Sequence, residues 1–238
     1  MIKRLSLTVF LSFVISSWGS TAFADNHGRA TGFLFAPYLW GVSIDGDNPD
    51  IDASFSDILD AANFALSLHT EYRTDQWSFV FDPTYLDLEV EGPLGGDIGI
   101  DIWLIEAWAG YVVSDGLEII GGARYQDQEI KPERTIGPGN NTIEAGDDWT
   151  DWFAGVRYIT PISDLWVLAL RGDVVIAGDS DSATNGQVFF NRRFGDNMLL
   201  NLGYRYFDSD FDNEETGLSA FAWDVVMTGP VVGYTWIF

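Results

Sequence analysis

The sequence contains no cysteine, and it has only 12 lysine and arginine residues against 36 aspartate and glutamate residues, for a formal net charge of −24. Without cysteine the chain has no disulfide, no thiolate metal site and no cysteine nucleophile. Such an acidic balance argues against a nucleic-acid partner, because binding to phosphates requires clusters of basic side chains. It is compatible with divalent cations or with strong hydration in a salty medium.

Long apolar runs are scarce as well. Basic residues at positions 3 and 4 precede an apolar stretch at 5–15, and the small residues Ala22 and Ala24 follow it. This order predicts a secretory signal peptide over residues 1–24, with cleavage after Ala24. The alternative is an N-terminal membrane helix, for which the apolar stretch is short. No later segment approaches about 18 consecutive apolar residues, so we expect no helical span, and we expect residues 25–238 to form one domain.

Aromatic residues are plentiful, and they mark the end of the chain. Counting back from Phe238 in steps of two meets Trp236, Tyr234, Val232 and Pro230, whereas the intervening positions are smaller and mixed. Because successive side chains on a strand point to opposite faces, this pattern predicts a strand with one apolar, aromatic face. A last strand that carries Tyr234, Trp236 and a terminal Phe238 resembles the signal that brings Gram-negative outer-membrane barrels to the barrel-assembly machinery.

Ten stretches alternate well enough to be strands. They are 32–45, 62–73, 77–90, 100–113, 117–129, 149–160, 165–177, 185–193, 198–210 and 224–238. Most reach or exceed the roughly 9–11 residues that a tilted strand needs to cross a bilayer. The sequence therefore predicts an all-β fold, a transmembrane antiparallel up-and-down β-barrel of ten strands.

Three alternatives to this fold remain open. Eight strands result if 62–73 and 185–193 are loops. Residues 54–62 favour a short helix equally well. A soluble sandwich or barrel with its apolar face inward has the same period of two.

The predicted connections alternate between two kinds. Short ones fall at 74–76, 114–116, 161–164 and 194–197, and longer ones at 46–61, 91–99, 130–148, 178–184 and 211–223. Short periplasmic turns and long external loops are typical of bacterial barrels. An even number of strands places both chain ends at the periplasmic side.

Sorting each strand into two faces gathers charged residues on the polar face, which a membrane barrel turns inward. Arginine is suited to paired hydrogen bonds with carboxylates in buried settings. We therefore predict either a structural network that fills a narrow lumen or a charged constriction in a small-solute pore. The predicted lumen residues are Glu71, Arg73, Asp82, Glu106, Arg124, Arg157, Arg171, Asp173 and Arg205.

The longer loops are acidic. Asp208, Asp210 and Asp212 have the spacing of a calcium loop but lack the glycine and the distal glutamate of an EF-hand. A solvated acidic loop is the simpler interpretation. The more specific hypothesis is that Ca²⁺ or Mg²⁺ weakly bridges these carboxylates to lipopolysaccharide phosphates. No other cofactor is expected.

An enzyme is the main alternative of another class, because some outer-membrane barrels act on lipids or peptides at their rim. Of the two histidines, His27 falls in the expected flexible N-terminal segment and His69 on the inward face near Glu71. Ser67 or Ser78 would have to supply a nucleophile, and no spacing specifies one. A structural role for His69 is the preferred interpretation, so we expect no enzymatic activity.

Short motifs spread over nearly the whole mature chain support the barrel interpretation. Phe35-Ala-Pro37-Tyr-Leu-Trp40, Asp82-Pro-Thr-Tyr85, Gly203-Tyr-Arg-Tyr206 and Gly229-Pro230 resemble those of poorly characterised proteobacterial outer-membrane barrels related to outer-membrane protein A and W type barrels. The resemblance implies an outer-membrane location in contact with lipid and lipopolysaccharide, and it carries no catalytic residues. We expect a monomeric structural barrel or narrow pore, with a rim enzyme or an adhesin that binds through acidic loops as alternatives.

Overall fold

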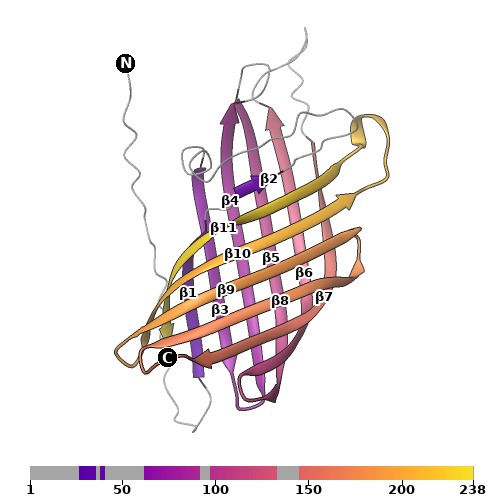
Figure 1. Cartoon of the computed structure of the whole chain (residues 1–238). Helices are drawn as coiled ribbons and strands as arrows, with labels where there is room; N and C mark the ends of the chain where they lie inside the picture. Colours follow the sequence, from indigo (N-terminus) through magenta and orange to yellow (C-terminus); the bar gives the residue numbers. More distant parts are fainter. Residues whose placement is uncertain (1–26, 36–37, 41–61, 92–96, 133–144, 238) are drawn as a thin grey trace, which may run out of the picture.

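The computed structural model describes residues 27–35, 38–40, 62–91, 97–132 and 145–237. These residues form antiparallel strands and one short 3-10 helix, η1 (Gly217–Ser219) (Figure 1). Within these ranges no helix is long and apolar enough to cross a bilayer. The strands are β1 (His27–Phe35), β2 (Tyr38–Trp40), β3 (Ala62–Arg73), β4 (Trp77–Glu91), β5 (Asp97–Ser114), β6 (Leu117–Pro132), β7 (Ala145–Pro161), β8 (Trp166–Gly178), β9 (Ser182–Phe194), β10 (Met198–Asp212) and β11 (Ala222–Ile237).

All of these strands belong to one sheet, and pairing of β1 with β11 closes it. The ring contains ten strands, β1 and then β3 to β11 in sequence order, and each is antiparallel to its neighbours. The short strand β2 pairs with β11. The predicted ten-stranded up-and-down barrel is therefore confirmed. The eight-stranded alternative is wrong, because β3 and β9 are full members of the ring.

The first strand differs from its prediction. The structure starts β1 at His27, which pairs with Arg73 of β3, instead of leaving His27 in a flexible segment. Residues 27–31 do not alternate in polarity, so ladder pairing with two neighbours, and not periodicity, extends the strand. Residues 41–61, which include most of the helix considered at 54–62, lie outside the described residues.

The connections follow the predicted asymmetry with one exception. At one end of the barrel the connections are residues 74–76, 115–116, 162–165 and 195–197. The turn between β5 and β6 contains Gly116 with φ of 74°, a conformation that glycine adopts without steric cost. At the other end, the predicted long loop at 178–184 is wrong, because β8 and β9 are joined by 179–181 alone. We refer to these as the short-turn end and the loop end.

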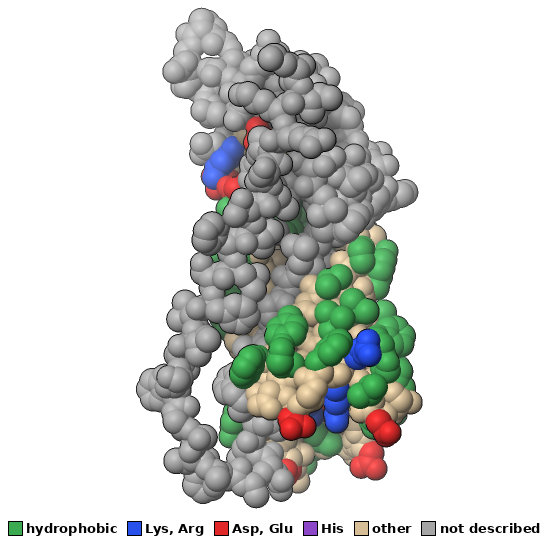
Figure 2. All heavy atoms as spheres, turned by 90° about the vertical axis from the view of Figure 1, so that its left-hand side faces the viewer, with side chains coloured by type: hydrophobic (Ala, Val, Ile, Leu, Met, Phe, Trp, Pro, Cys, Tyr) green, Lys and Arg blue, Asp and Glu red, His purple; other side chains and the backbone are tan. Residues whose placement is uncertain are grey.

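The outer surface between the two ends is apolar. Hydrophobic side chains gather on the face seen in Figure 2, and those that are large and exposed come from most strands of the ring. They include Leu66, Leu68, Tyr72, Trp77, Phe79, Phe81, Trp103, Tyr111, Val113, Ile119, Trp152, Val156, Tyr158, Leu170, Val174, Ile176, Phe190, Phe194, Leu202, Tyr204, Tyr206, Val232 and Trp236. In this zone the inward positions carry the charged and amide side chains, so polarity is reversed relative to a soluble barrel.

Aromatic pairs mark the limits of this apolar zone on β4 and β5. Trp77 and Tyr111 contact each other near the short-turn end, with ring centroids 4.9 Å apart. Tyr85 and Trp103 do the same toward the loop end, with centroids 4.5 Å apart. Aromatic girdles at both interfaces are a feature of membrane barrels.

Beyond the second aromatic pair the strands continue, and their polarity inverts. On β4 the outward residues become Asp87 and Glu89, while the inward residues become Leu86 and Leu88, which are buried. Strand β10 changes in the same way after Tyr206. Here the barrel has an apolar interior and an acidic outer surface, as in a soluble protein. Several carboxylates predicted in loops therefore lie on strands, among them Asp147, Asp148 and Asp212.

Candidate functional site

The barrel interior holds the charged residues because each lies in the inward register of its strand. Glu106 of β5 is fully enclosed, and it receives hydrogen bonds from Arg124 of β6 at 2.9 Å from Nε and 2.6 Å from Nη2. Arg171 of β8 donates to the same carboxylate at 3.0 and 3.2 Å. Arg205 of β10 reaches it at 3.3 Å. One carboxylate thus joins three arginines.

Asp173 completes this central cluster. Its carboxylate accepts from Arg124 at 2.6 Å, from Arg171 at 2.7 Å and from the Asn185 amide at 2.7 Å. All of these side chains are buried. Charges in a low-dielectric interior are tolerated only when they are paired and hydrogen-bonded, and this arrangement meets that requirement.

The contact between Arg205 and Glu106 crosses the full width of the barrel. In the ring of ten strands, β5 and β10 are five positions apart, so they lie opposite each other. The ion pair of 3.3 Å between these opposite walls bridges the lumen at that point. Gln126 of β6 also reaches across, donating to Ser209 of β10 at 3.1 Å. At this level of the barrel, side chains from opposite strands therefore meet across the lumen.

A second cluster lies toward the short-turn end. Arg157 of β7 binds Glu71 of β3 at 3.0 Å and Glu118 of β6 at 2.6 Å. Arg73 pairs with the same two carboxylates, at 3.0 Å to Glu71 and 2.6 Å to Glu118. The ring of His69 has Nδ1 at 3.2 Å from Asp82 and Nε2 at 3.4 Å from Glu71. These contacts link β3, β4, β6 and β7 through the lumen.

Aromatic rings pack against the guanidinium faces of both clusters. Arg157 and Arg171 lie over the indole of Trp108, with Cζ 4.7 and 5.0 Å from the ring centroid. Arg124 lies 4.8 Å from the centroids of both Phe153 and Phe207. Stacking of this kind holds each arginine in place while its edge binds carboxylates.

The structure places all nine predicted lumen residues in the interior and brings them into these two clusters. Sequence reasoning missed Glu118, which binds two arginines and equalises the count at five arginines and five carboxylates. Glu118 shares the inward parity of Arg124 on β6, so the register was sufficient to find it. Asp151 shares the inward parity of Arg157 on β7 but was not among the predicted lumen residues; it is buried and accepts hydrogen bonds from the Ser180 hydroxyl and amide.

Toward the loop end the lumen is filled by an apolar layer. Trp149 of β7 stacks on Phe211 of β10, with parallel rings whose centroids are 4.2 Å apart. The layer consists of Leu86, Leu88, Ile100, Ile102, Leu104, Ile130, Trp149, Phe207, Phe211, Phe221, Trp223, Val225 and Met227. The charged clusters are thus closed off from the loop end by packed side chains.

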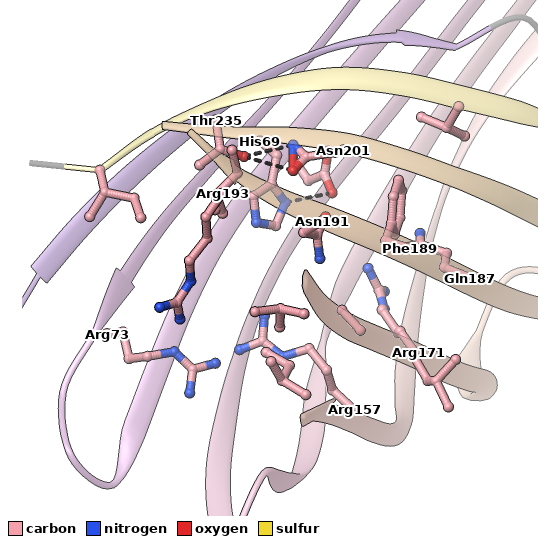
Figure 3. Close-up of a pocket in the computed structure, with 18 of the residues that line it drawn as sticks. His69, Arg73, Arg157, Arg171, Gln187, Phe189, Asn191, Arg193, Asn201 and Thr235 are labelled. Carbon is pink, nitrogen blue, oxygen red and sulfur yellow. Dashed lines mark hydrogen bonds and ion pairs between the residues drawn. The ribbon is translucent and has the colours of Figure 1, made fainter. Parts of the chain in front are cut away.

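On the short-turn side of the clusters lies a cavity of about 580 Å³. Figure 3 shows arginines from several strands around this space. The lining includes Gly195 and Asp196 of the turn between β9 and β10, so the cavity extends to that end of the barrel. Its apolar wall includes Trp108, Val167, Phe189 and Leu199.

The remaining predicted sites are less organised. Asp208, Asp210 and Asp212 follow one another on the outer face of β10, and Asp208 accepts a hydrogen bond from the Tyr206 hydroxyl at 2.9 Å. Among the described residues no group of three or more carboxylates, histidines or cysteines is arranged to hold a metal ion. In the predicted assembly signal, Trp236 is exposed on the outer face of β11 and Tyr234 shares its register, whereas Phe238 lies outside the described residues.

No family model and no curated protein matches the chain. Among solved structures, the chain is similar to the translocator domain of the autotransporter NalP from Neisseria meningitidis, with 12% identity over 91% of this chain and 90% of that chain and a TM-score of 0.47. The β domain of the Bordetella autotransporter BrkA shares 11% identity over 90% and 99%, with a TM-score of 0.44. Ail, the attachment invasion locus protein of Yersinia pestis, shares 11% over 91% and 100%, with a TM-score of 0.40. Each likeness concerns the course of the chain alone.

Proposed function

We propose that this chain is an integral outer-membrane β-barrel whose lumen is closed, so that it serves as a structural membrane protein and not as an open pore. The observation that carries the proposal is the contact of Arg205 with Glu106 between opposite strands of the ring. Both the charged clusters and the apolar layer of Trp149 and Phe211 would have to rearrange before a solute passed.

The outer surface supports a membrane location. Soluble monomers rarely expose apolar patches larger than a few hundred Å², whereas here exposed aromatic and aliphatic side chains extend around the barrel. Trp77 and Tyr85 are eight residues apart on β4, which corresponds to about 26 Å along the strand. Because barrel strands are tilted by ~40° from the barrel axis, the height between the two residues along that axis is about 20 Å. That height is close to the ~25 Å apolar band of outer-membrane barrels.

The ends of the barrel support an orientation. His27 of β1 lies beside Arg73, at the turn that leads into β4, and Ile237 of β11 donates its amide to Asn197 in another short turn. Both ends of the described barrel therefore lie at the short-turn end, which is periplasmic in bacterial barrels. In this orientation the cavity faces the periplasm and the acidic strand extensions face outward.

The geometry around His69 supports a non-enzymatic role. Both ring nitrogens contact carboxylates, Asp82 and Glu71. The Ser67 hydroxyl lies 2.8 Å from that of Thr84, and Ser78 donates to Glu118 at 3.0 Å. Neither ring nitrogen is therefore placed to accept a proton from one of these serines, which nucleophilic catalysis by a serine requires.

The closed lumen is testable by liposome swelling. Liposomes that contain the purified protein should swell in isotonic arabinose no faster than empty liposomes, because packed side chains span the barrel. A general porin incorporated at the same protein-to-lipid ratio is the positive control. Swelling whose rate falls with the size of the sugar would contradict the proposal and favour the narrow pore.

The membrane-facing surface is testable with a charge at its middle. Phe81 is four residues from Trp77 and from Tyr85 and points outward. Phe81→Arg should lower the free energy of unfolding in lipid vesicles by about 2–4 kcal/mol, because it places a cation at the bilayer midplane. Glu89→Arg is the matched control on the same face of β4, beyond the aromatic pair, and should change it by less than about 1 kcal/mol. Equal effects of the two variants would place Phe81 outside the bilayer.

A further inference from the structure

We propose that the cavity at the short-turn end binds a small soluble amphipathic anion, a phosphate or carboxylate group on a compact apolar body. Its location on the periplasmic side rests on the orientation proposed above, whereas binding itself depends only on the cavity. A volume of about 580 Å³ falls within the ~300–1,000 Å³ of typical small-molecule sites.

The charge of the lining favours an anion. Five of the chain's arginines line the cavity, against two carboxylates, Asp82 and Asp196. They are Arg73, Arg157, Arg171, Arg193 and Arg205. This is the opposite of the whole chain, in which acidic residues outnumber basic ones threefold.

Four of these arginines, all except Arg193, are paired with carboxylates that lie deeper in the barrel wall. Glu71, Glu106 and Glu118 are at most 3% exposed and do not line the cavity. A solute that enters therefore meets arginine side chains before it meets these three glutamates. In surroundings with a low dielectric constant, such an arrangement attracts negative charge more strongly than the same groups do in water.

Strand β9 contributes two unused donors. Arg193 is exposed at the mouth of the cavity, and Asn191 lies two residues deeper on the same inward face. Within the described residues, neither side chain makes a hydrogen bond or ion pair with another residue. Figure 3 shows Arg193 and Asn191 beside the cavity, which Arg73 and Arg157 also line. Guanidinium groups bind phosphate and carboxylate through paired hydrogen bonds, so Arg193 is suited to receive the ligand's head group.

The rest of the wall fits an apolar body. Trp108, Val167, Ala169, Phe189 and Leu199 line the cavity together with the arginines. Ligand sites commonly combine a predominantly apolar lining with a few polar groups that fix orientation. An inorganic anion alone would leave this part of the wall unoccupied, which is why an amphipathic anion is the better match.

The test measures binding of phenyl phosphate to the folded barrel by isothermal titration calorimetry. Phenyl phosphate should bind at least about tenfold more tightly than inorganic phosphate, and benzyl alcohol and benzylamine should show no saturable binding. Raising NaCl from 50 to 500 mM should weaken binding several-fold, because the attraction is electrostatic. The proposal is overturned if the alcohol or the amine binds as well as phenyl phosphate, or if phenyl phosphate does not bind.

Two neighbouring arginines on β9 provide a matched pair of variants. Arg193→Gln should weaken phenyl phosphate binding by about tenfold or more, since a charge-assisted hydrogen bond is lost. Arg192→Gln removes the same charge one residue away on the outer face, where Arg192 packs on Phe194, and should leave binding unchanged. Arg193→Lys should retain part of the affinity. Equal losses in Arg193→Gln and Arg192→Gln overturn the site, whereas the swelling assay tests the closed barrel independently.

Discussion

Replacing Glu106 by alanine is expected to cost about 3–5 kcal/mol of unfolding free energy, or to prevent folding outright, because it leaves buried arginines without their common partner. Glu106 binds Arg124, Arg171 and Arg205 and is 1% exposed. Asp173 can compensate the charge of Arg124 and Arg171 only in part. The effect is measured by denaturant unfolding in lipid vesicles, followed by tryptophan fluorescence and by the mobility shift between folded and heated protein on a gel.

The control for Glu106 is an exposed acidic residue in a comparable ion pair. Glu129 lies 2.7 Å from Lys131, with both side chains about 40% exposed. Glu129→Ala should change the unfolding free energy by less than about 1 kcal/mol, because exposed ion pairs contribute little. Glu106→Gln preserves the shape and removes the charge, so a loss close to that of alanine would trace the effect to charge neutralisation. A loss in Glu106→Ala no greater than that in Glu129→Ala would refute the structural role of the central cluster.

The second large effect is expected at the apolar layer. Trp149→Ala should lower the free energy of unfolding by about 3–5 kcal/mol, because it removes a large buried side chain and leaves a cavity. Trp149 is 2% exposed and stacks on Phe211 from across the lumen. The same denaturant assay measures the change, and differential scanning calorimetry should show a corresponding fall in melting temperature.

Trp152 provides the comparison within the same strand. It is 58% exposed on the outer surface, which faces lipid in the location proposed above. Trp152→Ala should therefore cost much less than Trp149→Ala, since alanine at the outer surface leaves no internal cavity. Should the two variants prove equally destabilising, the inside and outside of β7 would have been assigned incorrectly.

Period-two alternation predicted the strands, and the alternation of short and long connections favoured a barrel over a soluble sandwich. The predicted strand at 62–73 coincides with β3, because turn residues bound it on one side and apolar residues alternate along it. The same parity predicted which charged residues face inward. Parity does not give the height of a residue in the barrel, however, and the ion pair of Arg205 with Glu106, 99 positions apart in the sequence, depends on strand tilt and stagger that emerge only on closure.

The apolar layer and the cavity were not predicted for a related reason. Strands β4 and β10 invert their polarity after Tyr85 and Tyr206, so one alternating pattern ends where an opposite one begins. Leu86 and Leu88 face inward, so they break the apolar-out pattern of a membrane strand, although the backbone pairing of β4 continues through them. The cavity arises from side chains of many strands that meet only in the closed ring, and no single stretch of sequence indicates it.

The closed lumen is tested most directly by planar-bilayer recording of the purified wild-type protein. In 1 M KCl at 100 mV of either sign, the inserted protein should give no stable conductance steps above the bare membrane. Insertion is confirmed by recovery of folded protein from the vesicles that form the bilayer. This silence is expected because Glu106 and Arg205 join opposite walls and Trp149 and Phe211 close the layer beyond them. Discrete, reproducible steps of uniform size in the wild-type protein would contradict the account and establish an open pore.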